Sequence, residues 1–149
     1  MDLLVAVDGS EQSVAALDHA LDLAEAAGAS VTVVHAVEPS VYDEGGSEPI
    51  RGLADADDRI VIENVADAEE RGEDVLDRAR QRAEERGITV RDEALYGNPI
   101  QVVPRYAEEN GIDGIFVGHV GRSERVEAMI GSVAKTLVER SPVPVTVVR

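Results

Sequence analysis

The sequence predicts an α/β protein in which a parallel β-sheet is covered by helices on both faces. Short apolar runs, typical of buried strands, alternate along the chain with longer segments whose apolar residues recur every three or four positions. The resulting order, β-α-β-α-β-α-β-α-β, favours a parallel sheet, because parallel neighbours are joined by crossover helices. We expect one domain that spans residues 1–149.

The first part of the chain predicts two buried strands, Leu3–Val7 and Val31–Val37. The helix between them begins after Ser10, a plausible N-cap, and ends at Gly28. Residues 39–53 contain Pro, Gly, Ser and Asp without a helical or strand period, so they predict a mobile loop.

A long helix is predicted over residues 55–86, because small and apolar residues, Val61 among them, recur there in steps of three and four. Its other side chains are charged or carry amides, which indicates a solvated outer surface with opposite-charge pairs. The next strand, Ile88–Leu95, carries charges in its middle and is therefore expected at a sheet edge.

The last third of the chain predicts two further helices and two further strands, 113–117 and 143–148. Asn98 and Pro99 suit the cap and first turn of one helix, which Pro104 is expected to bend. The final helix shows an apolar stripe that is expected to be buried, formed by Val126, Ile130, Val133 and Leu137.

The charge is strongly negative, with 30 acidic and 14 basic residues. Such a chain repels phosphodiester backbones, so nucleic acid is not an expected partner. The acidic residues are spread over every predicted helix instead of forming one binding face. We interpret them as adaptation to a salty cytoplasm, where molar salt shortens the Debye length to about 3 Å and weakens carboxylate repulsion.

Two absences narrow the class of protein further. The chain has no cysteine, which excludes disulfides and thiolate metal sites. No apolar run approaches the length of a membrane span, and the N-terminus has no basic flank. We therefore expect a soluble cytoplasmic protein without a membrane partner.

The glycine-rich stretch from Gly118 to Ser132 is the candidate binding site. It follows the apolar strand and opens the last helix, where glycine lets backbone N–H groups approach an anion and the helix dipole favours negative charge. Its spacing is Gly118-x2-Gly121-x9-Gly131-Ser132.

This spacing resembles the nucleotide-binding motif of the ATP-binding branch of the universal stress protein family. The resemblance extends to V-A-V-D-G-S near the start, V-V-H-A-V, G-N-P and the closing S-P-V-P-V-T-V-V-R. One departure lies between the first two glycines, where His119 and Val120 replace the Ser with His or Arg that is usual in the family. The backbone site is expected to survive, without a hydroxyl contact from the first of these positions.

The resemblance implies a Rossmann-like five-stranded sheet in the order 3-2-1-4-5, similar to adenine nucleotide alpha hydrolases and nucleotidyl transferases. Strands one and four then flank the point where the strand order reverses, and ligands of open α/β sheets bind there. Asp8 ends the first strand and Gly118 ends the fourth. Both are therefore expected in one crevice.

The resemblance and this placement together predict the residues that bind an adenine nucleotide. Asp8 is expected to bind the ribose or adenine edge, although it also suits a turn or cap before the first helix. The backbone of Ala36 is expected to meet adenine, whereas Arg122 and His119 are expected on the phosphate side. The full set is Val7, Asp8, Ala36, Val117, Gly118, His119, Gly121, Arg122, Gly131, Ser132 and Val133. The expected ligand is ATP, or ADP or AMP, with Mg²⁺ carried by the phosphates and no protein metal site.

The chain lacks the common signatures of nucleotide-dependent enzymes. It contains no G-x-x-x-x-G-K-[ST], no H-x-G-H and no G-x-G-x-x-G, and Asp8 is the single carboxylate placed in the crevice. We expect a regulatory nucleotide-binding stress protein without catalytic residues. Two alternatives stay open: a slow ATPase or self-phosphorylating switch that uses Ser132, and an interaction module that binds no nucleotide.

The terminal strand Pro144–Val148 is apolar and is expected at a sheet edge. An open apolar edge can pair with another chain, and the family commonly dimerises through this strand. We therefore expect a homodimer with a two-fold contact.

Overall fold

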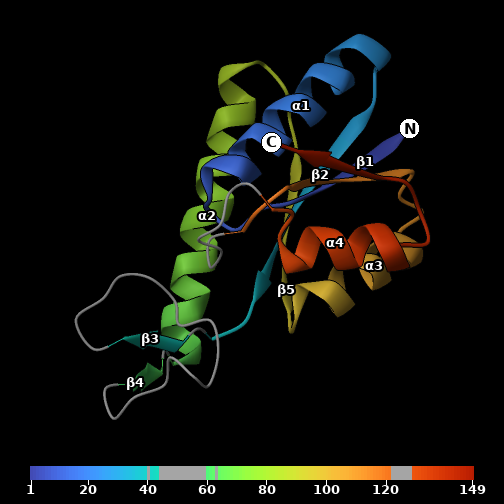
Figure 1. Cartoon of the computed structure of the whole chain (residues 1–149). Helices are drawn as coiled ribbons and strands as arrows, with labels where there is room; N and C mark the ends of the chain where they lie inside the picture. The colour runs from blue at the N-terminus through green and yellow to red at the C-terminus, as the bar shows by residue number, and fades with distance from the viewer. Residues whose placement is uncertain (40, 44–59, 63, 122–128) are drawn as a thin grey trace.

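The computed structural model describes residues 1–39, 41–43, 60–62, 64–121 and 129–149. Its main sheet consists of five parallel strands, which are β1 (Asp2–Ala6), β2 (Ser30–Val37), β5 (Arg91–Tyr96), β6 (Gly114–Gly118) and β7 (Val145–Val148). Their spatial order is β5-β2-β1-β6-β7. This order confirms the predicted 3-2-1-4-5 sheet, with the reversal between β1 and β6 (Figure 1).

Four helices among the described residues cover the sheet. They are α1 (Glu11–Ala27), α2 (Val65–Glu85), α3 (Pro99–Glu109) and α4 (Ser132–Arg140). The first two lie on one face of the sheet and the last two on the other (Figure 1). No helix among the described residues is long and apolar enough to cross a membrane.

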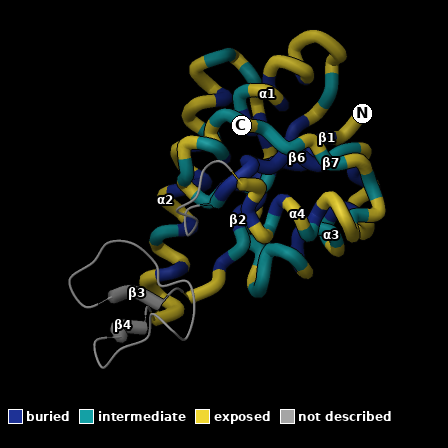
Figure 2. The backbone as a smooth tube through the Cα atoms, viewed as in Figure 1, coloured by how far each residue is buried: buried dark blue, intermediate teal, exposed yellow. Residues whose placement is uncertain are grey.

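Alternation along each strand creates two cores, one beneath each helical layer. Successive side chains of a strand point to opposite faces. In β1, Val5 therefore joins the core under α1 and α2, whereas Leu4 joins the core under α3 and α4. Leu17 and Leu137, both almost fully buried, come from the opposing helices. Figure 2 shows the buried strands between the two layers.

Side-chain and glycine caps set the ends of the helices as predicted. Ser10 accepts a hydrogen bond from the Ser13 N–H at 3.1 Å, and Gly28 ends α1 in the left-handed conformation. Asn98 caps α3 through the Ile100 N–H, with Pro99 in the first turn. Pro104 lies inside α3, which continues through it to Glu109.

Helix α2 begins later than predicted, at Val65 and not near residue 55. The helix begins at Val65, after Asn64 accepts a hydrogen bond from the Asp67 N–H at 2.9 Å. Val61, placed in that helix by its spacing, belongs to strand β4 (Ile60–Ile62), which pairs antiparallel with β3 (Val41–Asp43). The three consecutive β-branched residues of β4 favour a strand. Their strand preference outweighs the helical spacing on which the prediction relied.

The prediction of a mobile loop over residues 39–53 is also partly wrong, because this segment contains strand β3. Positions 40 and 44–53 of that prediction lie outside the described residues.

The two edges of the sheet differ in polarity. Strand β5 is an edge, as predicted, and its Arg91, Asp92 and Glu93 are exposed. Such charges discourage pairing with another strand. Strand β7 forms the other edge, and three of its four side chains, including Val147, are half-buried.

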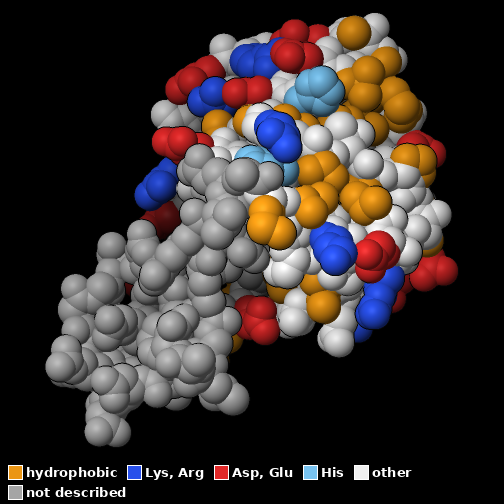
Figure 3. Space-filling view, viewed as in Figure 1, with side chains coloured by type: hydrophobic (Ala, Val, Ile, Leu, Met, Phe, Trp, Pro, Cys, Tyr) orange, Lys and Arg blue, Asp and Glu red, His pale blue; other side chains and the backbone are white. Residues whose placement is uncertain are grey.

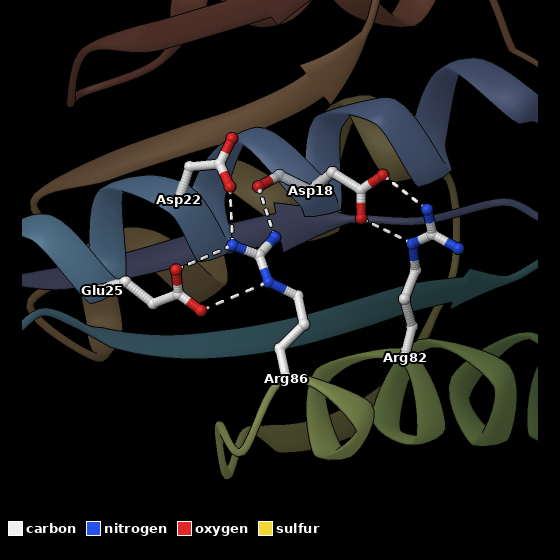
Figure 4. A network of polar contacts seen from close by, with 5 residues as sticks. All are labelled: Asp18, Asp22, Glu25, Arg82 and Arg86. Atoms are coloured by element: carbon white, nitrogen blue, oxygen red, sulfur yellow. Dashed lines mark hydrogen bonds and ion pairs between the residues drawn. The ribbon is translucent and has the colours of Figure 1, made fainter.

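Ion pairs join α1 to α2 at the outer surface (Figure 4). Arg82 contacts the Asp18 carboxylate at 2.5 and 2.7 Å. Arg86 contacts Asp22 at 2.6 Å and Glu25 at 3.0 Å, and it also donates to the Asp18 carbonyl at 3.3 Å. The hydrogen bond with Asp18 raises the pKa of Arg82, and those with Glu25 and Asp22 raise the pKa of Arg86. Arg80 also pairs with Asp77, one turn earlier in α2, so the expected opposite-charge pairs connect two helices as well as neighbouring turns of one.

Candidate functional site

A pocket lies at the carboxyl ends of β1, β2 and β6, where the strand order reverses. Its volume is about 190 Å³. The strand ends contribute its floor, and all four helices contribute to its walls. Of the eleven predicted site residues, eight line it: Val7, Asp8, Ala36, Val117, Gly118, Gly121, Ser132 and Val133.

The turn that follows β1 holds the Asp8 carboxylate at the wall of this pocket. Its Oδ1 accepts hydrogen bonds from the Ser10 N–H at 3.0 Å and the Ser10 hydroxyl at 2.5 Å. Its Oδ2 faces the glycine stretch, since a Cβ built on Gly121 would lie 2.9 Å from this oxygen. Asp8 thus stabilises the turn with one oxygen and borders the pocket with the other.

Glycine at position 121 is explained by the space available to a side chain and not by the backbone conformation. Its φ is not among the positive values that the structure shows for five other glycines. A side chain there would instead meet Asp8 Oδ2 and occupy the pocket. The structure therefore favours a spatial reason for this glycine, and its place beside the pocket agrees with the prediction.

Gly118 has a different role. A Cβ at this position would lie 2.7 Å from the Gln12 carbonyl carbon and 2.9 Å from its oxygen. Real Cβ atoms do not approach backbone atoms this closely, so Gly118 is what lets the end of β6 pack against α1. Its side-chain position is buried beneath the helix while the residue still borders the pocket.

The first turn of α4 forms one wall of the pocket. Gly131 is the N-cap, and its N–H donates to the His119 carbonyl at 2.5 Å. Ser132, Val133 and Ala134 follow and line the pocket. The first N–H groups of a helix have no partner inside the helix, and they carry its positive dipole end. This wall therefore suits an anionic group.

Three predictions near this wall need correction or lie beyond the structure. His119, expected on the phosphate side, is buried and does not line the pocket; its N–H donates to the Val148 carbonyl at 2.8 Å. Ile130, expected in a buried stripe, is 45% exposed because it precedes α4, and Val133 is only half-buried. Arg122 and Val126 lie outside the described residues.

The sequence reasoning missed several pocket residues. Glu38 follows β2, while Pro99 and Val103 come from α3 and Val120 from the glycine stretch. In the sequence these residues look like ordinary core or surface positions, so nothing in it indicated that they line a pocket. The tertiary arrangement alone brings them to the switch point.

Arg71 is the most informative of the missed residues. It belongs to α2, whose polar side chains were predicted to be solvated, yet it is half-buried and lines the pocket. Its Nη2 donates to the Glu38 carbonyl at 3.4 Å. The signal that was available is Gly72, a glycine inside a helix.

Gly72 allows α2 to lie close to β2. A Cβ at Gly72 would lie 2.9 Å from Cδ2 of His35 and 3.4 Å from Cγ2 of Val37. His35 is buried, with Nδ1 2.8 Å from the Val7 carbonyl, so this nitrogen carries the hydrogen and donates. The neighbouring Arg71 is thereby brought to the end of β2.

The architecture defines the class of protein first: a doubly wound α/β domain with a ligand pocket at its switch point. The chain belongs to the universal stress protein family, whose model matches residues 1–149.

Individual relatives agree with this assignment. A universal stress protein of Bacillus subtilis, YxiE, is 30% identical over 99% of this chain and 97% of its own length. A solved universal stress protein in complex with cAMP is 27% identical, with a TM-score of 0.68 over 100% of this chain and 97% of that one. The Archaeoglobus fulgidus universal stress protein in complex with dAMP has a TM-score of 0.69 at 22% identity, over 100% and 98% of the two chains, and supports the fold.

Proposed function

We propose that this protein binds an adenine nucleotide, ATP with Mg²⁺ in particular, and acts as a regulatory stress protein of the ATP-binding branch. The observation that carries the proposal is the position of Asp8 Oδ2 opposite Gly121, which brings the first strand and the glycine stretch to one pocket. A nucleotide in this pocket has its phosphates at the glycine stretch and α4, and its base at the end of β2.

Each end of the pocket suits one part of that ligand. The N–H groups at the start of α4 and the hydroxyl of Ser132 favour phosphate oxygens. The opposite end is bordered by Ala36, Pro99 and Val103, which offer apolar contacts to a base. A family relative solved in complex with cAMP, a cyclic adenine nucleotide, supports adenine nucleotides as the class of ligand.

Magnesium is part of the proposal because of charge. The described lining residues include the carboxylates of Asp8 and Glu38, and Arg71 is the only arginine or lysine among them. The whole chain carries a formal charge of −16. A polyphosphate that enters with Mg²⁺ brings less negative charge into this environment.

We propose binding without efficient catalysis. Asp8 accepts two hydrogen bonds from Ser10 through Oδ1, which is a structural role in the turn after β1, and we assign its other oxygen to ligand binding instead of proton transfer. Slow hydrolysis or self-phosphorylation at Ser132 is the alternative. Single-turnover assays with labelled ATP distinguish them: release of labelled phosphate, or label retained on the protein and lost in Ser132→Ala, would replace the binding-only proposal.

A homodimer through β7 is the proposed assembly. Exposed apolar side chains in the C-terminal region include Met129, Ile130 and Val138, and Figure 3 shows hydrophobic side chains gathered over α4 and β7. We expect light scattering to give the mass of a dimer and Val147→Lys to give a monomer. A monomeric parent protein, or a dimer that persists in the variant, contradicts this assembly.

Salt adaptation is the proposed reason for the acidic surface. Below about 0.1 M salt the Debye length exceeds about 10 Å, and carboxylates repel one another over longer distances. The melting temperature should therefore fall as KCl is diluted. A melting temperature that stays constant from molar to millimolar KCl would exclude this explanation.

Calorimetry in molar KCl tests the proposed function itself. We expect one ATP per chain, with weaker binding when Mg²⁺ is removed, and we expect ADP and AMP to compete for the same site. No heat and no thermal shift with any of the three nucleotides would exclude nucleotide binding and favour a module that binds no nucleotide.

A further inference from the structure

Arg71 lies on the β2 side of the pocket, and the glycine stretch lies on the β6 side. Arg71 reaches the Glu38 carbonyl, just past the end of β2, whereas Gly118 ends β6 and Gly121 follows it. Strand β1 lies between β2 and β6. Neighbouring strands are about 4.8 Å apart, so the two strand ends are separated by about 10 Å. This is enough to place Arg71 and the phosphate wall at opposite ends of a nucleotide.

The walls around Arg71 come from both helical layers. Arg71 enters from α2, on one face of the sheet, and Pro99 and Val103 enter from α3, on the other. Ala36 lies between them on β2. A planar group at the end of β2 would therefore have the guanidinium on one side and apolar side chains on the other.

We infer that Arg71 is the base-recognition residue of this pocket, with its guanidinium over one face of the purine and Pro99 and Val103 along the other. The inference rests on the proposed function. A guanidinium is planar and weakly hydrated, so it stacks on aromatic rings in a way that an ammonium group does not. The close approach of α2 at Gly72 keeps it at the pocket and limits the entropy lost on binding.

This assignment differs from a phosphate-binding role in a measurable way. An arginine that covers the base contributes equally to adenosine, AMP and ATP, because all three carry the same base. An arginine that binds phosphates contributes nothing to adenosine and most to ATP. Comparing ligands that carry different numbers of phosphates therefore distinguishes base recognition from phosphate binding.

The test is calorimetry of adenosine, AMP and ATP with Mg²⁺ against four proteins: the parent, Arg71→Ala, Arg71→Lys and Arg78→Ala. Arg78 lies two turns further along α2, outside this pocket, and its removal changes the net charge equally. We expect Arg71→Ala to weaken all three ligands by about tenfold, Arg71→Lys to weaken them similarly, and Arg78→Ala to change none.

Three outcomes overturn the assignment. If Arg71→Ala loses affinity for AMP and ATP but not for adenosine, Arg71 binds phosphate. If Arg71→Lys binds all three ligands as tightly as the parent, only the positive charge of Arg71 matters. If Arg71→Ala binds all three ligands as tightly as the parent, Arg71 has no role in binding. If Arg71→Ala has a lowered melting temperature, Arg71→Lys supplies the comparison with a folded protein. A parent protein that binds none of the ligands contradicts the proposed function, whereas tight binding unchanged by the Arg71 variants contradicts only this inference.

Discussion

Gly118 and Gly121 stand three residues apart in one glycine-rich stretch, but the protein needs them for different reasons. At Gly118 an added Cβ would meet the backbone of Gln12, so this glycine allows α1 to pack on the end of β6. At Gly121 the contact that the described residues show is with a carboxylate oxygen of Asp8, at the edge of the pocket. The first glycine serves the fold, and the second keeps the proposed binding site open.

This difference shows that one motif combines residues with separate functions. The helix backbone beside Gly118 cannot move without disturbing α1, whereas the Asp8 side chain can rotate away from a new neighbour. Substitution at the first position should therefore change stability, and substitution at the second should change binding. The following variants test that separation, beginning with the largest expected effect.

Gly118→Ala should destabilise the protein by about 3 kcal/mol, because its Cβ would lie 2.7 Å from the Gln12 carbonyl carbon. Gly114→Ala, in the same strand, is the matched control, since the nearest atom to its Cβ would be Leu3 Cδ2 at 3.8 Å. Chemical denaturation measures both. Similar stabilities for the two variants would show that the contact with α1 does not require glycine.

Ser132→Ala should weaken ATP about tenfold and leave the melting temperature nearly unchanged. The residue opens α4 at the pocket wall and is exposed, so it offers a hydroxyl to a phosphate at little cost to the core. Titration of ATP measures the loss, and Ser132→Thr, which keeps the hydroxyl, is the control. If alanine binds ATP like serine, the phosphates do not contact this side chain.

Arg86→Ala should have the smallest effect, confined to stability. Arg86 joins Asp22, Glu25 and the Asp18 carbonyl at the α1–α2 surface, away from the pocket lining. Salt screens such exposed pairs, so the fall in melting temperature should be larger at low KCl than at molar KCl. The control is Arg78→Ala. A change in ATP affinity for Arg86→Ala would show that the two regions are coupled.

The sequence allowed the sheet and much of the pocket to be predicted, because the signals were local. Apolar runs marked the strands, and Asp8 and Gly118 each followed one of them. With strand order supplied by the family resemblance, the carboxyl ends of those strands had to meet. The glycine spacing then placed Gly121 and Ser132 at the same edge, where the structure has them.

The features that were missed depend on contacts between distant segments. Arg71 has the sequence environment of a surface helix, and only the approach of α2 to β2 at Gly72 brings it to the pocket. His119 was predicted on the phosphate side, but its backbone hydrogen bonds with Val148 of β7 and with Gly131 hold it in the interior. Neither contact leaves a periodic pattern in the sequence.

The central claim is that a nucleotide occupies the pocket between Asp8 and Gly121, and titration of Gly121→Val with ATP and Mg²⁺ tests it most directly. Valine would fill the space beside Asp8 Oδ2, so we expect affinity to fall about 100-fold while the melting temperature stays close to that of the parent. If the folded variant binds ATP as tightly as the parent, the nucleotide lies elsewhere and the proposed site is wrong.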